Sequence, residues 1–185
     1  EIDTGLHTLM ALNQASRLSK DPKVRYATLL HDVGKGKTNP LRWPRHPGHE
    51  VRGLPLVQGL SRRLRTPVAY QRLAERVARY HGLAHRALSL SPGATVDLLQ
   101  RLDAIRQPDA FEDFLLAVIA DARGRPGYEE APYPQADWLR LALATVQSAS
   151  VSEWARSGLK GRDLAQAIRA ARIQAVARAR STFKS

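Results

Sequence analysis

The 185-residue sequence contains no cysteine, which excludes disulfide bonds and zinc sites built from thiolates. It has no apolar run near the roughly 20 residues of a membrane-spanning helix, and we expect no membrane partner. No signal peptide opens it, so we expect a cytoplasmic protein. The first residue is Glu rather than Met, and we expect the chain to be a piece of a longer protein.

Acidic residues are scarce relative to basic ones. The chain has 29 Lys and Arg residues against 17 Asp and Glu, a formal net charge of +12. A field of that sign suits phosphate-rich partners, acidic membranes or anionic substrates, and arginine suits bidentate phosphate contacts. A solvated basic surface is the simpler alternative. With 43% hydrophobic residues, the composition is that of a globular domain with a sizeable core.

No alternating strand pattern appears, and the apolar periodicity predicts an all-α fold without internal repeats. Pro55 is expected to kink the third helix or delay its start, and residues 38–48 are expected to form a loop. The expected helices run from Asp3–Thr4 to Leu18, from Asp21–Pro22 to His31, from His49 to about Arg65, from Thr66–Pro67 to His81, from a Thr95 cap to before Pro108, from Asp109 past Asp121, over about 134–147, briefly around Trp154, and after Gly161.

Four residues are candidate metal ligands: His7, His31, Asp32 and Asp121. The adjacent pair follows an apolar helical stretch and the other two lie on different helices, and a helical bundle can gather such side chains in its core. Imidazole and carboxylate ligands suit divalent Mn, Ni, Co, Zn or Mg. Taken singly, a histidine on an apolar helix face is usually a hydrogen-bonded core residue, and an aspartate at a helix C-terminus is usually exposed. Together they indicate a metal centre that hydrolyses phosphate esters.

The order H…HD…D resembles the HD-domain metal phosphohydrolases, and residues 31–36, HDVGKG, resemble the fuller form of that signature. The resemblance implies a helical bundle with the metal in its core, held by the four candidate ligands. It also implies that Lys35 approaches the substrate phosphate, where an ammonium would neutralise phosphoryl oxygens. The alternative for Lys35 is a solvated loop lysine.

Further histidines sharpen the resemblance. In HD hydrolases with extra histidines at such places, these bind a second metal or the phosphate, which implies such roles for His49, His81 and, less strongly, His85. With one metal, they would instead be phosphate donors or proton-transfer groups, and both alternatives stay open. His46 is expected to be a loop residue. The expected catalytic set is His31, Asp32, Lys35, His49 and His81.

Longer segments match, in order, the C-terminal HD domain of bacterial multifunctional CCA-adding enzymes. They are Glu1–Thr8, residues 31–36, Leu41–His49, Asp121–Arg125, Tyr133–Gln135, Trp138–Leu139 and Gly158–Gly161. This resemblance implies one HD phosphohydrolase domain in 1–185, with a metal-site core of about 1–127 and a C-terminal helical extension of about 128–185. It also implies an N-terminal nucleotidyltransferase region that is absent here. One departure is Gly82, where relatives often carry Asp.

That family implies a metal-dependent phosphohydrolase for 2',3'-cyclic nucleotides, 2'-nucleotides and other phosphate esters, within a tRNA CCA-adding or repair enzyme. The metal is open among Ni, Mn, Co and Mg. The implied partners are tRNA, nucleotide substrates and the N-terminal nucleotidyltransferase domain, and a homodimer is left open. The expected phosphate or tRNA contacts are Arg42, Arg45, Arg123 and Arg125.

Two alternatives assign the domain a role without turnover. A basic tRNA-binding domain would give salt-sensitive affinity without metal, and Trp43 and Tyr133 could stack on exposed bases. A nucleotide-sensing HD domain would need an intact pocket only. The complete H…HD…D set argues against the sensor, because a sensor need not keep every ligand.

Overall fold

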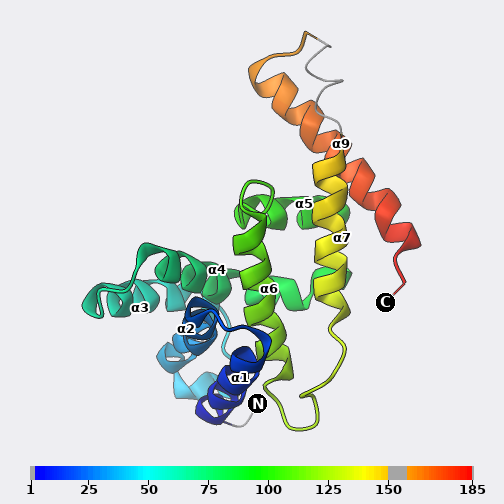
Figure 1. Ribbon diagram of the computed structural model, residues 1–185. Helices are drawn as coiled ribbons and strands as arrows, with labels where there is room; N and C mark the ends of the chain where they lie inside the picture. Colours follow the sequence, from blue (N-terminus) through cyan, green and yellow to red (C-terminus); the bar gives the residue numbers. More distant parts are fainter. Residues whose placement is uncertain (1–2, 150–157, 185) are drawn as a thin grey trace. The chain divides into compact units, whose positions relative to one another are not determined.

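The computed structural model describes residues 3–149 and 158–184 (Figure 1). Every regular element in these two ranges is helical, which confirms the all-α prediction. The chain forms two compact units: unit 1 comprises residues up to 85 together with 109–133, and unit 2 comprises 86–108 and the residues from 134 onward. Residues 86–108 thus group with the expected C-terminal extension. The assignment of 1–185 to a single domain stays a prediction.

Unit 1 contains all the candidate site residues. Its elements, with η for a 3-10 helix, are α1 (Thr4–Leu18), α2 (Pro22–Leu30), η1 (Val33–Lys37), η2 (Pro40–Arg42), α3 (His49–Arg63), α4 (Val68–His85) and α6 (Pro108–Arg123). The first residue of α6, Pro108, is assigned to unit 2. Unit 2 contains η3 (Ala87–Ser89), α5 (Pro92–Arg101), α7 (Pro134–Ser148) and α9 (Gly161–Thr182). The expected helix around Trp154 lies outside the described residues.

Local capping chemistry sets the start of the first two helices. The Asp3 carboxylate accepts from the backbone N–H of Gly5 at 2.7 Å and of Leu6 at 3.0 Å. Asp21 accepts from the N–H of Lys23 at 2.9 Å, with Pro22 in the first turn. Both caps agree with the sequence, since short acidic side chains satisfy the unpaired donors of a helix start.

α3 begins at His49 as expected and carries Pro55 in its interior, so the proline does not delay its start. Likewise, α5 ends at Arg101, before Pro108. Two other expected helix boundaries are wrong. Thr95 lies inside α5, and the cap is Ser91, whose Oγ accepts from Ala94 N at 3.2 Å. The fourth helix also runs on beyond His81 to His85, which places both histidines on one element.

Two glycines allow the backbone approaches that bring the site residues together. A Cβ at Gly34 of η1 would collide with the carbonyl oxygen of His49 and lie 2.6 Å from Gly53 N in α3. A Cβ at Gly124, just after α6, would lie 2.7 Å from Ala11 N in α1. Real side chains do not tolerate such contacts, so only glycine fits at either position.

Apolar packing supports these approaches. α4 packs against both α2 and α3, and α1 packs against α2. Val24, Val57 and Val77 are fully buried in α2, α3 and α4. Unit 2 has its own core around Trp138, with the Arg180 guanidinium 5.0 Å from the centre of the indole.

Among the described helices, none combines the length and the apolar character that crossing a membrane would require.

Candidate metal centre

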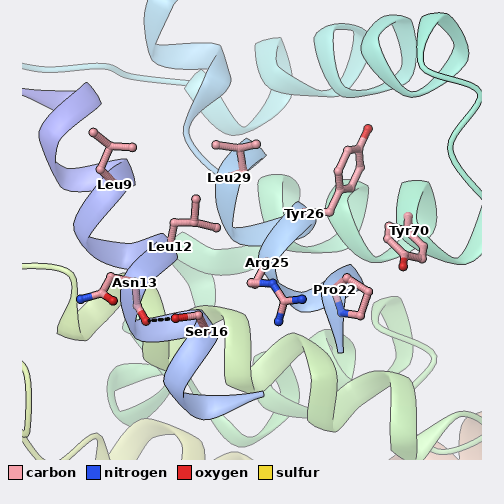
Figure 2. A pocket seen from close by; sticks show the side chains of 9 residues that line it. All are labelled: Leu9, Leu12, Asn13, Ser16, Pro22, Arg25, Tyr26, Leu29 and Tyr70. Carbon is pink, nitrogen blue, oxygen red and sulfur yellow. Dashed lines mark hydrogen bonds between the residues drawn. The ribbon is translucent and has the colours of Figure 1, made fainter. Parts of the chain in front are cut away.

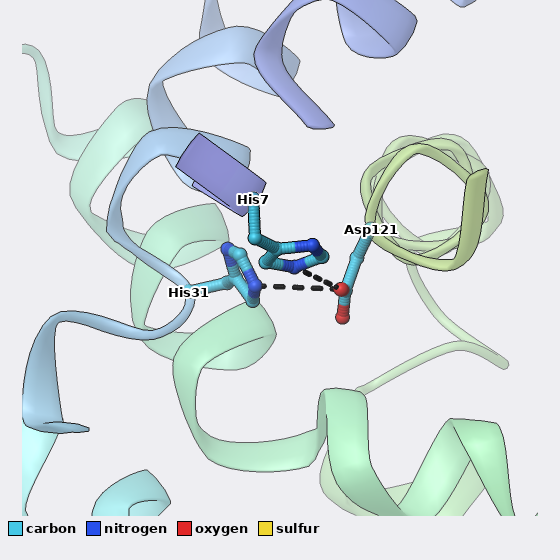
Figure 3. A group of neighbouring side chains, drawn as sticks. All are labelled: His7, His31 and Asp121. Atoms are coloured by element: carbon cyan, nitrogen blue, oxygen red, sulfur yellow. Dashed lines mark hydrogen bonds and ion pairs between the residues drawn. The ribbon is translucent and has the colours of Figure 1, made fainter. Parts of the chain in front are cut away.

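Two groups of side chains with metal-ligand chemistry lie in unit 1. The first group consists of His7, His31 and Asp121, and Figure 3 shows both imidazoles turned toward one carboxylate. His7 Nε2 lies 2.9 Å from Asp121 Oδ1, and His31 Nε2 lies 3.4 Å from the same oxygen. All three side chains are buried. In this group, the ligand atoms lie within 4.8 Å of one another, close enough to share one ion.

The second group consists of Asp32, His49 and His81, and its ligand atoms also lie within 4.8 Å of one another. Asp32 Oδ1 lies 3.2 Å from His49 Nε2 and 3.5 Å from His81 Nε2. Its other oxygen, Oδ2, lies 3.1 Å from His31 Nε2. Asp32 therefore joins the two groups, with one oxygen directed at each.

The four imidazoles share one orientation. Each directs Nδ1 at a backbone carbonyl at 2.7–2.9 Å, and a carbonyl can only accept a hydrogen bond, so each Nδ1 carries the proton. All four Nε2 atoms face the carboxylates, and in the neutral imidazole each Nε2 carries a lone pair that can bind a metal ion. This is the arrangement in which a backbone acceptor fixes the tautomer of a metal-binding histidine. The carbonyls belong to Gly124 for His7, Thr28 for His31, His46 for His49 and Val77 for His81.

This arrangement fits a bound cation. The Nε2 atoms of His49 and His81 lie 3.3 Å apart, and two lone pairs at that distance repel unless a proton or a metal ion lies between them. Within residues 3–149 and 158–184, His31 Nε2 and Asp32 Oδ1 are buried and have no hydrogen-bond partner. Buried polar atoms are normally satisfied. An ion in the first group would satisfy His31 Nε2, and an ion in the second group would satisfy Asp32 Oδ1.

The pKa shifts in the metal-free cluster also favour a bound cation. Burial works against charge on His31, but the carboxylates of Asp121 and Asp32 outweigh it and raise the pKa of His31 well above its usual value. Burial likewise opposes charge on the two carboxyls, yet the surrounding imidazoles hold the pKa of Asp32 and of Asp121 below the usual range. The carboxylates are therefore ionised and attract a cation.

Two further groups touch the carboxylates from outside. Lys35 Nζ forms an ion pair of 2.6 Å with Asp32 Oδ2. His85 Nε2 lies 2.7 Å from Asp121 Oδ2, and its Nδ1 lies 2.8 Å from the hydroxyl of Tyr133. No local pattern in the sequence identifies Tyr133 as a partner of His85, because 48 residues separate them. Its hydroxyl faces His85, and both side chains are half-buried.

The expected arginine contacts are not gathered at the carboxylates. Arg42 and Arg45 are exposed in the loop before α3. Arg123 is directed at the backbone instead, because its Nε donates a hydrogen bond of 3.0 Å to the carbonyl oxygen of Ala131. Arg125 lines a cavity of about 600 Å³ that His7 also lines. At the departure from the family pattern, a Cβ on Gly82 would lie 3.1 Å from Glu50 Oε1, so an aspartate there would crowd an existing carboxylate.

A family model described as "HD domain" matches residues 4–122. The chain belongs to the HD-domain family. This family comprises metal-dependent hydrolases, and its H…HD…D order corresponds here to one buried cluster. The histidines and aspartates expected at the HD site all lie in or against that cluster, whereas their individual roles stay predictions.

The HD-domain chain is also similar to the C-terminal part of several curated proteins named "Multifunctional CCA protein". It is 51% identical to the one from Nitrosococcus oceani over 97% of this chain and 44% of the relative. It is 53% identical to the one from Methylococcus capsulatus over 98% of this chain and 43% of the relative. The chain thus spans less than half the length of these relatives. No solved structure matches it.

Proposed function

We propose that unit 1 is a metal-dependent phosphohydrolase for 2',3'-cyclic nucleotides, 2'-nucleotides and other phosphate esters. The observation that carries the proposal is the shared orientation of His7, His31, His49 and His81, whose Nε2 atoms converge on two buried carboxylates. Such a set of nitrogen and oxygen ligands suits a divalent ion. Manganese, nickel or cobalt fits the four imidazoles better than magnesium, which prefers oxygen ligands.

The ligand roles follow from the two groups. His7, His31 and Asp121 would hold one ion together with Asp32, and Asp32, His49 and His81 would hold a second. When bound, the metal would polarise a phosphoryl oxygen and lower the pKa of an attacking water. With a single ion in the first group, His49 would be the proton donor, because it is the most exposed of the four imidazoles.

The reaction makes defined demands on the other residues. Hydrolysis of a 2',3'-cyclic phosphate adds one water, breaks one P–O bond to ribose and delivers a proton to the departing ribose oxygen. Asp32 would orient the water, since its carboxylate stays ionised. Lys35 pairs with Asp32, lines the same cavity and would neutralise the phosphoryl oxygens as charge develops.

The relatives' name supports a wider context. We propose that this domain belongs to a tRNA CCA-adding or repair enzyme, with tRNA and an N-terminal nucleotidyltransferase domain as partners. A cytoplasmic location and a homodimer are part of the same proposal. CCA addition itself would need the nucleotidyltransferase domain.

A binding domain without turnover is the weaker candidate. Its argument rests on the basic surface, above all on the arginines of α9. Two of these have structural roles within unit 2, because Arg169 makes a bidentate contact with Asp97 and Arg180 lies over Trp138. A tRNA-binding role also leaves the buried carboxylate cluster of unit 1 unexplained.

The experiment measures metal content and hydrolysis of 2',3'-cyclic AMP, 2'-AMP and 3'-AMP. We expect bound divalent metal and turnover that a chelator abolishes. His31→Ala and Asp32→Asn should abolish turnover while leaving the fold intact by circular dichroism. Asp137→Asn, which changes an exposed aspartate of unit 2, should keep it. Retained turnover in the His31 and Asp32 variants would refute the assignment, and absence of both metal and turnover would favour the binding role.

A further inference from the structure

A cavity of about 700 Å³ opens beside the carboxylate cluster. Asp32 and Lys35 line it, and so do Trp43, Pro44 and His46 of the loop. The rest of the wall comes from Asp3, four residues of α1, Leu29 of α2, and Val33 and Gly36 of η1. A volume of this size is typical of sites that hold a small organic ligand.

Three large apolar side chains remain exposed where they line this cavity. Trp43 is 63% exposed, Leu9 is 64% exposed and Leu29 is 44% exposed. Leu9 and Leu29 also line the hollow between α1 and α2 seen in Figure 2, so these two side chains are shared by the cavity and that hollow. Exposed apolar side chains that converge on one concave surface indicate a binding site. The hollow of Figure 2 contains neither site carboxylate among its lining residues.

Two kinds of side chain line the cavity. The Lys35 ammonium and the proposed metal ligand Asp32 suit a phosphate. The loop contributes an indole and an imidazole, and His46 is held by a contact of 3.0 Å between its Nδ1 and Thr38 Oγ1. A flat indole suits a nucleobase, because every base has a face that stacks on an aromatic ring.

We propose that this cavity holds the nucleoside part of the substrate, with the base stacked on Trp43 and the phosphate at Asp32 and Lys35. The inference rests on the proposed phosphohydrolase function and adds the side chain that recognises the base of a nucleotide substrate. Trp43 acts in specificity and not in the chemical step. Purine nucleotides should bind best, since they offer the larger stacking face.

Steady-state kinetics test the proposal with 2'-AMP and with glycerol 2-phosphate, an ester that lacks a base. Loss of one base-stacking contact weakens binding about tenfold, so Trp43→Ala should raise KM for 2'-AMP about tenfold at unchanged kcat. Hydrolysis of glycerol 2-phosphate should not change, and Trp43→Phe should restore most of the nucleotide preference. Leu41→Ala is the matched control, because Leu41 is 93% exposed on the same loop and does not line the cavity.

A binding measurement separates this inference from the proposed function. 2'-AMP should quench the tryptophan fluorescence of the metal-loaded protein, and Trp43→Phe should abolish the quenching, although two other tryptophans remain. Turnover of both esters with an unchanged KM in Trp43→Ala overturns the inference and leaves the phosphohydrolase intact. If the wild type turns over neither ester, the proposed function fails, and the binding measurement alone decides on the base site. Quenching in the wild type that is lost in Trp43→Phe supports the base site. Quenching that Trp43→Phe retains, or that the wild type does not show, overturns the base site.

Discussion

The hydroxyl of Tyr133 lies 2.8 Å from Nδ1 of His85. Burial raises the pKa of Tyr133, and the charge of Asp121 raises it further, so the phenol keeps its proton and donates it to Nδ1. The other nitrogen, Nε2, then carries the imidazole proton and donates to Asp121 Oδ2 at 2.7 Å. This leaves Oδ1 of the same carboxylate facing His7 and His31. Tyr133 is therefore a positioning residue for a proposed metal ligand.

Tyr133→Phe should weaken metal binding without unfolding the protein. The loss of a group that orients a metal ligand typically costs about 10–100-fold in metal affinity, and we expect the lower end because His85 itself remains. Calorimetric titration of the chelator-treated protein with Mn²⁺ or Ni²⁺ measures the change. Tyr128→Phe, at a tyrosine that is 56% exposed, should bind metal like the wild type. Equal affinities for both variants would show that Tyr133 does not position Asp121.

His49→Gln should remove one ion and leave another. The second group would lose one of its three members, whereas His7, His31 and Asp121 stay in place. We therefore expect about two ions per chain in the wild type and about one in the variant, as for a two-metal site. Metal analysis after gel filtration measures this ratio, with His46→Gln as the control because His46 lies outside both groups. A wild-type ratio of one would favour the single-ion alternative.

Local chemistry in the sequence predicts part of this architecture and omits the rest. The caps at Asp3 and Asp21 are local, and both were predicted. The error at Thr95 arose because Ser91 is an equally good cap, and the following Pro92 favours a start there. The HD signature predicts the ligand types. It does not predict the ring orientations, since the carbonyl that fixes His7 lies 117 residues away, at Gly124.

The metal-free protein should lose stability as the pH rises above neutrality. A histidine whose pKa is raised in the folded state stabilises the fold fully below its unfolded value of about 6.5, and this contribution disappears as the pH rises through the folded value. His31 and His49 both have raised pKa values. We expect the Tm in chelator to fall as the pH rises above about 6.5. It should fall less in His31→Gln, and equal slopes would contradict the prediction. Metal affinity should rise over the same range because protons compete for Nε2.

Gly34→Ala should destabilise unit 1, whereas Gly36→Ala, two positions further along η1, should not. The added methyl at Gly34 meets the backbone of His49 and Gly53, which cannot move without displacing α3. Overpacking of this kind costs about 1–3 kcal/mol. At Gly36, no atom lies within 4 Å of the added Cβ, so the change should be neutral or slightly stabilising. Urea unfolding measures both. A Gly34→Ala variant as stable as the wild type would show that η1 does not approach α3 this closely. Because η1 carries Lys35 and directly follows Asp32, Gly34→Ala should also weaken metal binding.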